Sequence, residues 1–474
     1  MDGPFSLPHT TFEGAVFPAV PQGAAASMLA VLHQLAQTQY VPPEEMAGLQ
    51  FRQIEALAAH IDRAVPHYGV SLRRAGIRPG QAITEAAWRN VPVLSRTAIQ
   101  EAGAALHARD MPQGHGSIAS ATTSGSSGRP VTIRKSALSR FYWQCFTLRE
   151  QDWHQRDLRQ LKMTLLRDDQ RGDDAPDPIR RSDDWGEPIS VIYPTGPAIL
   201  LDYRADVSVL WQAVLRERPA ILTTFPSLLA ALVQHSIADG HRPEGLREVR
   251  TVGEALSGDL QTLCESVWGV RITNIYSAAE IGVIAFPCRE HGRMHVQSEN
   301  VKLEILRPDR TPCDVGEEGD VVLTPLHNFA MPLIRYDIGD RAIFGAPCAC
   351  GRKLPVLSGV PGRARDMLTM PNGERRFPYY GHGEIMRIEA IAQHQVAQTG
   401  PGQIDIRLVV RRPLTADEEA HVVGIASRHL GAGFAVRLVY HPELKRGPGG
   451  KFAEFTNEYE GARVTPRVEG LPPA

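Results

Sequence analysis

The chain has 474 residues, of which 43% are hydrophobic and 22% are charged, a composition typical of globular proteins with two or three domains. Its 51 basic and 53 acidic residues leave a formal net charge of −2, which argues against a nucleic-acid partner and a membrane partner. No stretch approaches the roughly 18 consecutive apolar residues of a membrane span, and the N-terminus lacks the pattern of a secretory signal, so we expect a cytoplasmic protein.

Residues 1–45 are rich in Ala, Pro and Gln, and two alternatives stay open for them, a packed arm or a mobile one. Further along, apolar residues at helical spacing predict a helix over residues 205–218, then a strand over 219–225 and a second helix that opens at Ser227. More strands are expected at residues 248–252, 271–276, 301–306 and 320–326. This alternation predicts an α/β fold with helices on the faces of a parallel or mixed sheet.

A second, smaller unit is expected after residue 361. Strands near residues 404–411 and 435–440 flank a helix near 416–430. We therefore divide the chain into a large domain, residues 1–361, and a small C-terminal α+β domain, residues 362–474, with a hinge near residues 362–366.

The segment TTSGSSGRPV, residues 122–131, is rich in hydroxyl side chains and glycine. Such a loop can turn several backbone N–H groups toward one phosphate, because glycine adds no side-chain bulk. It is not a Walker loop, since Arg129 and Pro130 replace the Lys-Ser/Thr pair. A flexible linker is the alternative interpretation of a Ser/Gly-rich stretch. The candidate phosphate-binding residues are Thr123, Ser124, Gly125, Ser126, Ser127 and Gly128.

Five further motifs follow this loop in a fixed order. They are Gly253-Glu254-Ala255, Tyr276-Ser277-Ala278-Ala279-Glu280, Tyr336-Asp337-Ile338-Gly339-Asp340, Gly362-Arg363-Ala364-Arg365-Asp366 and Gly449-Gly450-Lys451. With these motifs the chain resembles the adenylate-forming superfamily of acyl-CoA synthetases, luciferases and nonribosomal adenylation domains. It is most similar to the phenylacetate-CoA ligase branch, over roughly Ile54 to the end.

The resemblance implies a nucleotide site. Gly253 and Glu254 correspond to the family's adenine-side motif, and Tyr276, followed by Ser277, offers a ring on which adenine stacks. Asp340 corresponds to the acid that accepts hydrogen bonds from both ribose hydroxyls. Arg363 is expected to contact ribose or phosphate. On its own, each of these residues has an ordinary structural interpretation, such as a turn aspartate or a core tyrosine.

The resemblance also implies catalytic residues. Glu280 corresponds to the acidic Mg²⁺ ligand, and Lys451, after a run of glycines, to the adenylation lysine, so both are the expected catalytic residues. Asp366 corresponds to the hinge about which the family rotates its small domain. Ala279 departs from the pattern, because relatives commonly carry Thr or Ser there.

The implied chemistry has two steps. A carboxylic acid and ATP form an acyl adenylate, which then passes its acyl group to coenzyme A. An aromatic or other small apolar acid is the expected substrate, with Phe141, Tyr142, Trp143 and Phe225 as candidate pocket walls. An amine or a carrier-protein acceptor is the alternative, and a non-catalytic nucleotide-binding relative is a third. Whether the protein forms a homodimer stays an open question.

Four residues suggest a structural zinc site. Six cysteines do not make a disulfide framework in a chain of this length, so clustered cysteines point to a metal. The histidine ligand is expected to be His295, and His291 is the alternative because it lies three residues after Cys288. Buried free thiols near unrelated histidines are the alternative. The expected ligands are Cys288, His295, Cys348 and Cys350.

Overall fold

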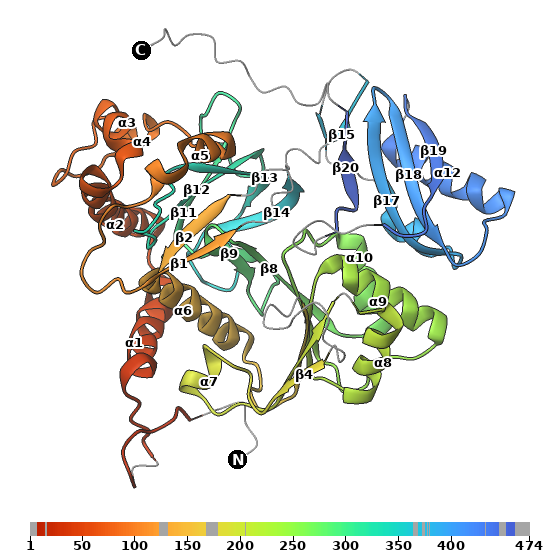
Figure 1. Cartoon of the computed structure of the whole chain (residues 1–474), viewed down its shortest axis with the longest axis horizontal. Coiled ribbons are helices and arrows are strands. Elements are labelled where there is room, and N and C mark those ends of the chain that lie inside the picture. The colour runs from red at the N-terminus through yellow and green to blue at the C-terminus, as the bar shows by residue number, and fades with distance from the viewer. Residues whose placement is uncertain are drawn as a thin grey trace. The chain divides into compact units, whose positions relative to one another are not determined.

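A computed structural model describes residues 7–14, 17–122, 131–166, 179–203, 205–363, 368–371, 375–376, 378, 380–431, 433–444 and 452–459 (Figure 1). Within these residues the chain forms two compact units, the first ending at Val360 and the second beginning at Pro361. Each unit has its own hydrophobic core.

A twelve-stranded mixed sheet organises the first unit, in the order β11-β12-β13-β14-β10-β9-β8-β7-β6-β3-β5-β4. The neighbours from β5 to β8 are parallel, whereas β4 at the edge and β9 beside β8 are antiparallel to their partners. This mixed sheet confirms the expected α/β fold class. The strands are β3 Lys162–Leu166, β4 Ile179–Ser182, β5 Ala198–Asp202, β6 Ile221–Thr224, β7 Glu248–Val252, β8 Arg271–Ala278, β9 Gly282–Pro287, β10 Met294–Val296, β11 Val301–Leu306, β12 Glu318–Pro325, β13 Tyr336–Gly345 and β14 Val356–Arg363. A separate antiparallel hairpin pairs β1 Ile118–Thr122 with β2 Thr132–Ser136.

Helices α8 to α10 share a buried cluster with the parallel strands and lie together in Figure 1. The second predicted helix, α9, begins one residue before Ser227, because Pro226 occupies its first position, where a missing N–H costs nothing. In the N-terminal region, α1 buries four apolar side chains, so this part of residues 1–45 is packed. The helices are α1 Gly23–Thr38, α2 Pro43–Ala64, η1 Pro66–Tyr68, α3 Gly69–Arg74, α4 Glu85–Arg89, α5 Arg96–Ala102, η2 Gly103–Leu106, α6 Ala137–His154, α7 Ile189–Ile192, α8 Val207–Glu217, α9 Pro226–Asp239 and α10 Gly258–Trp268.

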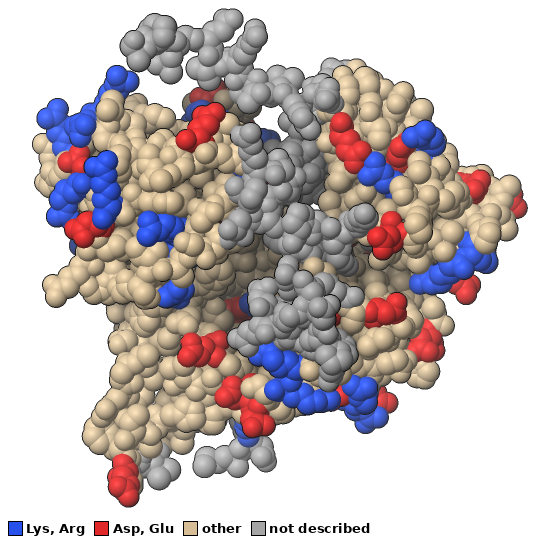
Figure 2. Space-filling model, in the orientation of Figure 1, with Lys and Arg blue, Asp and Glu red and all other residues tan. Residues whose placement is uncertain are grey.

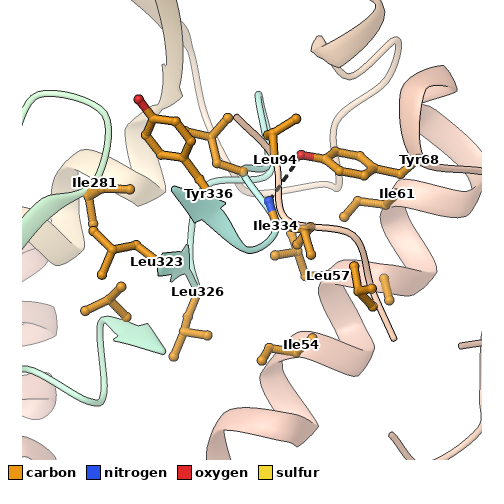
Figure 3. Packing of buried hydrophobic residues seen from close by; sticks show 14 of the residues in the cluster. Ile54, Leu57, Ile61, Tyr68, Leu94, Ile281, Leu323, Leu326, Ile334 and Tyr336 are labelled. Atoms are coloured by element: carbon orange, nitrogen blue, oxygen red, sulfur yellow. Dashed lines mark hydrogen bonds between the residues drawn. The ribbon is translucent and has the colours of Figure 1, made fainter. Parts of the chain in front are cut away.

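Helix α2 holds the chain segment that leads into β13. Its residues Ile54, Leu57 and Ile61 are at most 1% exposed and repeat at helical spacing along one face. They pack in one cluster with Tyr68, whose hydroxyl accepts a hydrogen bond from the backbone N–H of Ile334 at 3.1 Å (Figure 3). This packing fixes the start of β13, which carries Tyr336 and Asp340.

The second unit contains a four-stranded sheet in the order β19-β18-β17-β20. Parallel strands β18 and β19 are joined through α12, whose start is stabilised by a capping box between Thr415 and Glu418. The predicted helix and second strand match α12 and β19, and the first strand lies one residue earlier than expected. The elements are β15 Leu368–Thr369, β16 Arg375–Arg376, α11 His382–Ile385, β17 Ile391–Gly400, β18 Gln403–Val410, α12 Ala416–Leu430, β19 Ala435–Tyr440 and β20 Phe455–Asn457.

On the face shown in Figure 2, acidic and basic side chains are interspersed. Among the helices that the structure describes, none is both long and apolar enough to cross a bilayer.

Candidate functional site

The carboxyl ends of β6, β7 and β8 lie along one edge of the sheet. Thr224 at the end of β6 pairs with Thr251, and Val252 at the end of β7 pairs with Ile275. In open α/β sheets, ligands bind outside this edge. Two of the predicted motifs lie here, Gly253-Glu254-Ala255 after β7 and Tyr276–Glu280 at the end of β8, so their residues are brought to one side of the sheet.

Gly253 and Glu254 form the turn after β7. Gly253 has a φ of +80°, a conformation that glycine adopts without strain. The carboxylate of Glu254 accepts hydrogen bonds from the backbone N–H and the hydroxyl of Ser227, at 2.9 and 3.0 Å. The turn is thereby tied to the first residues of α9.

Tyr276 and Asp340 meet although 64 residues separate them in the chain. The hydroxyl of Tyr276, on β8, donates a hydrogen bond of 2.7 Å to Oδ2 of Asp340, on β13. Both side chains are half-buried, and Ser277 follows on β8. The ring and the carboxylate that were assigned to adenine and ribose therefore belong to one local site.

Glu280 lies just past β8 and is 8% exposed. Its Oε1 is 3.3 Å from Nη1 of Arg96, which begins α5. The segment before α5 is fixed to β13, because Leu94 exchanges backbone hydrogen bonds of 2.9 Å with Arg335 and Asp337. Arg96 is not among the predicted site residues, and its place beside Glu280 depends on this pairing across more than 200 residues.

Tyr336 connects these groups electrostatically. Burial, together with the negative charges of Glu280 and Asp340, raises the pKa of Tyr336 to about 12, and Arg96 opposes this rise. The pKa of the Tyr336 hydroxyl is thus raised by both carboxylates. Glu280 and the Tyr276–Asp340 pair therefore lie in the same electrostatic neighbourhood.

Lys135 on β2 is a further charged group of this neighbourhood. It is 8% exposed, and its Nζ lies 4.1 Å from the ring centroid of Trp143 on α6. Val131, Ile133 and Lys135 alternate on the buried face of the strand. The sequence places this lysine where the alternation of buried apolar residues on one strand face predicts another apolar residue. Motif matching missed this sign of a functional lysine.

The other candidate pocket walls are engaged in packing. Tyr142 stacks on His327 with ring centroids 3.7 Å apart. Phe225 is 8% exposed and packs edge-on against Tyr203. Of the aromatic candidates, Trp143 is the one that contacts a buried charge.

Cys288, His295, Cys348 and Cys350 come together in the first unit. Their ligand atoms all lie within 4.8 Å of one another, and the side chains of Cys288 and His295 are almost fully buried. His291, the rival ligand, is exposed in the turn before β10 and is not part of the cluster. The structure therefore favours His295.

The spacing of these atoms fits a tetrahedral ion. The sulfurs of Cys288 and Cys348 are 3.7 Å apart, and Sγ of Cys350 is 3.5 Å from Nε2 of His295. With metal–sulfur and metal–nitrogen bonds of about 2.3 and 2.0 Å, a tetrahedron has edges of about 3.8 and 3.5 Å. Burial lowers the pKa of His295 to about 4, which keeps its imidazole in the neutral, ligating form.

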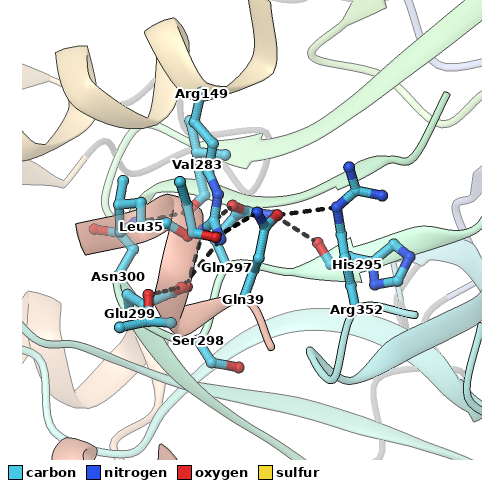
Figure 4. Close-up of polar contacts among 12 residues, drawn as sticks. Leu35, Gln39, Arg149, Val283, His295, Gln297, Ser298, Glu299, Asn300 and Arg352 are labelled. Atoms are coloured by element: carbon cyan, nitrogen blue, oxygen red, sulfur yellow. Dashed lines mark hydrogen bonds and ion pairs between the residues drawn. The ribbon is translucent and has the colours of Figure 1, made fainter. Parts of the chain in front are cut away.

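The loop that carries two of these cysteines also holds the end of α1. Arg352 donates from Nε to the side-chain carbonyl of Gln39 at 3.0 Å (Figure 4). The N–H of Lys353 donates to the backbone carbonyl of Gln39 at 2.8 Å. The two residues lie two and three positions after Cys350. The Cys/His cluster and the N-terminal helix therefore share one short loop.

A second contact holds α1 on its other side. The buried guanidinium of Arg149 donates to the carbonyl of Leu35 at 2.9 Å, to Gln297 at 3.0 Å and to Glu299 at 3.0 Å (Figure 4). Arg149 lies on α6 and its partners on α1 and on the segment after β10. One cation thus joins three separate parts of the chain.

Several predicted residues lie outside the described ranges. They are Thr123, Ser124, Gly125, Ser126, Ser127, Gly128, Asp366 and Lys451, and the side chain of Arg363 at the end of β14. Their roles stay predictions.

Comparison with known proteins identifies relatives of the chain. No family model matches it. The phenylacetate-coenzyme A ligase of Thermus thermophilus is 29% identical over 208 residues, 42% of this chain and 44% of the relative. The phenylacetate-coenzyme A ligase of Escherichia coli K12 is 29% identical over 144 residues, 29% of this chain and 32% of the relative. The chain thus aligns with less than half the length of either curated relative.

The fold is matched over most of the chain. A 2-hydroxyisobutyryl-CoA ligase, solved in its postadenylation state with an acyl adenylate, superimposes with a TM-score of 0.68 at 18% identity. The match covers 90% of this chain and 92% of that ligase. The fold expected from the motifs is therefore the fold observed.

Proposed function

We propose that this chain belongs to the phenylacetate-CoA ligase-like branch of the adenylate-forming superfamily and is an ATP-dependent ligase that joins a carboxylic acid to coenzyme A. The observation that carries the proposal is the meeting of Tyr276 and Asp340 at the carboxyl edge of the sheet, in the same electrostatic neighbourhood as Glu280. A stacking ring, a carboxylate for the ribose and a carboxylate for a hard cation are the groups that adenylation requires.

In the first step, a carboxylate oxygen of the acid attacks the α-phosphorus of ATP, and pyrophosphate leaves. Tyr276 and Asp340 would hold adenine and ribose, and Gly253 would give the base room. Glu280 would be a ligand of Mg²⁺, which offsets charge on the phosphates. The Ser/Gly loop at residues 123–128 and Lys451 would act on the same phosphates, as the resemblance implies.

The second step transfers the acyl group from AMP to a thiol. The small domain would rotate about a hinge near Asp366 to admit coenzyme A, while Arg363 would stay near the ribose or phosphate. The names of both curated relatives support coenzyme A as the acceptor. An amine or a carrier-protein thiol would require the same first step and is separated from coenzyme A by the assay below.

The ion held by Cys288, His295, Cys348 and Cys350 would be zinc, because three thiolates and one imidazole are the donors that tetrahedral Zn²⁺ prefers. Four protein ligands leave no position for water. The site would therefore stabilise the fold and take no part in the reaction.

The first experiment is a screen of carboxylic acids for pyrophosphate release with ATP and Mg²⁺, followed by addition of coenzyme A or amines to each positive acid. Glu280→Gln and Lys451→Ala are expected to lower the adenylation rate about a hundredfold, the effect of losing one preorganised electrostatic group. Glu85→Gln is the matched control, since Glu85 is exposed and pairs with Lys302. Pyrophosphate release at the unaltered rate in both site variants would exclude these roles.

A further inference from the structure

Helix α1 and the segments on both sides of it carry no charged side chain. Residues 14–43 contain no Asp, Glu, Lys or Arg, although 22% of the whole chain is charged. A surface helix normally turns charged and polar side chains to water on the face opposite its buried stripe. Depletion of charged residues is instead typical of the core of a protein–protein interface. The outer face of α1 is therefore suited to contact with another protein.

The inner face of α1 is firmly held, so its outer face is presented in a fixed position. Met28 and Leu32 are buried in one cluster with residues of α6 and α7. At the end of the helix, the hydroxyl of Thr38 donates to Glu299 at 2.7 Å, and Gln39 accepts from the loop after the last two cysteines of the Cys/His cluster. Figure 1 shows α1 at the margin of the first unit. A surface that is already ordered loses little conformational entropy when it binds.

The outer face of α1 is small in its first half and bulky in its second. Its exposed residues recur every three or four positions, which places them on one stripe of the helix. The polar side chains of this stripe hydrogen-bond to groups of α1 itself. The stripe consists of Gly23, Ser27, Ala30, Gln34 and Gln37.

Large apolar side chains are exposed at both ends of the same helix. Phe17 and Val20 precede α1, Tyr40 follows it, and Phe17 and Tyr40 are 74% and 51% exposed. Single exposed apolar residues are ordinary, but several around one uncharged helix mark an interaction surface. A helix of this length is about 24 Å long, so a partner that covers both ends has to run along it.

These features are complementary to themselves under a two-fold axis. If two α1 helices cross antiparallel at Ala30, residues at equal distances from Ala30 along the chain face each other. Gly23 then faces Gln37 of the second copy, and Val20 faces Tyr40 of the second copy. Each bulky half therefore meets a small half, the apolar ends are covered, and no like charges come together.

We propose that the protein forms a homodimer in which the α1 helices of the two copies pair antiparallel, with Ala30 at the two-fold axis. The inference goes beyond the proposed function and uses no step of it. A lipid surface is a poorer partner, because the outer stripe is small and polar and residues 14–43 offer no Lys or Arg to phospholipid headgroups. One helix face with its two ends is a small interface, so a Kd on the order of 1 μM is expected.

Sedimentation velocity over a dilution series tests the dimer. Wild type is expected to pass from dimer to monomer across that Kd. Ala30→Glu and Ala30→Lys should each raise the Kd about tenfold or more, because each brings two like charges to the axis. An equimolar mixture of the two variants should dimerise again, because Glu then faces Lys. Both substitutions suit an exposed helical position, and melting curves verify that the variants are folded.

Val209→Glu is the matched control. Val209 is 47% exposed on α8, so this variant adds the same charge to another exposed helical position, and its Kd should equal that of wild type. The orientation is tested by Ser27→Glu and His33→Lys in one chain. In the antiparallel pair each new Glu faces a new Lys, and the Kd should fall, whereas a parallel pair would bring like charges together and raise it.

Several results would overturn the inference. They are a wild type that stays monomeric far above the expected Kd, a dimer that neither charge at Ala30 weakens, and single variants that do not recover when mixed. A wild-type monomer that cosediments with vesicles of phosphatidylcholine and phosphatidylglycerol would identify lipid as the occupant and exclude the second copy. Pyrophosphate release measured on the same samples tests the proposed function separately, since adenylation does not depend on this pairing.

Discussion

Arg156 is buried between two carboxylates at the amino end of β7. Its guanidinium is 2.8 Å from Glu150 and 2.8 Å from Glu248, and all three side chains are at most 6% exposed. Arg250 forms a second ion pair with Glu150, at 2.7 Å. Glu248 is therefore the carboxylate that depends most on Arg156.

Replacing Arg156 by Met keeps the apolar stem but leaves Glu248 buried without its bidentate partner. Removing one partner of a buried pair costs about 3–5 kcal/mol. Since Arg250 still compensates Glu150, we expect the lower end, about 3 kcal/mol, in the free energy of unfolding of the first unit. The double variant Arg156→Met/Glu248→Gln should recover part of that loss, because it removes the uncompensated charge.

The sign of the pH dependence adds a second test. In the wild type, burial opposes ionisation, but hydrogen bonds and charge from Arg156 outweigh it and lower the pKa of Glu248 to about 2. Without Arg156, burial outweighs the remaining contacts with Thr273 and Arg271 and raises the pKa of Glu248, so the deficit of Arg156→Met relative to wild type should shrink as pH falls from 7 to 5.

Denaturant unfolding at both pH values measures these differences. Arg73→Met is the control, because Arg73 and Asp62 are also 2.8 Å apart but their side chains are 55% and 32% exposed. An exposed pair contributes about 0–1 kcal/mol. A loss below about 1 kcal/mol in Arg156→Met, or a deficit that grows on acidification, would refute the reasoning.

Three further predictions follow from the described contacts. If the Cys/His cluster holds the proposed zinc, a chelator or Cys348→Ser should speed amide hydrogen exchange in α1, because the loop with Cys348 and Cys350 also holds Gln39. Unchanged exchange in a protein shown to have lost its metal would contradict this. Burial lowers the pKa of His154 to about 4, so protonation of this histidine below pH 6.5 favours the unfolded chain. The free energy of unfolding should therefore fall by about 3 kcal/mol between pH 6.5 and pH 4. The same fall in a His154→Leu variant would be evidence against this explanation. Tyr276→Phe removes the hydrogen-bond donor to Asp340 and should weaken ATP binding about tenfold, measured by calorimetry. An unchanged Kd would show that this hydrogen bond does not contribute to nucleotide binding.

The regular elements were largely predictable, because their hydrophobic period is a local property. The helix expected over 416–430 and the strand over 248–252 are observed with these bounds as α12 and β7. Strand ends were less certain: β8 continues to Ala278, two residues beyond its expected end. The reason is tertiary, since β9 pairs antiparallel with the end of β8.

The candidate site was predictable only where a motif marked it. Tyr276, Asp340 and Glu280 were proposed from their motifs, whereas Arg96 and Lys135 were missed. Their positions depend on strand register and packing between distant segments, which a local pattern does not contain. His295, by contrast, was preferred to His291 from the sequence, and the structure gathers His295 with the three cysteines.

Some expectations remain predictions. The roles of residues 123–128, Asp366 and Lys451 fall on parts of the chain that the structure does not describe. The hinge motion, the cytoplasmic location and a homodimer are not tested by the fold.

The twelve-stranded sheet ends at β4, and this short outer strand carries two consecutive exposed arginines, Arg180 and Arg181. Arg181 forms a two-pronged ion pair with Glu217, with both contacts at 2.8 Å. A strand from another molecule that added here would have to cover these charges, and short charged edge strands are a known protection against aggregation. Crowded or partly unfolded preparations of the protein should therefore not polymerise through this edge.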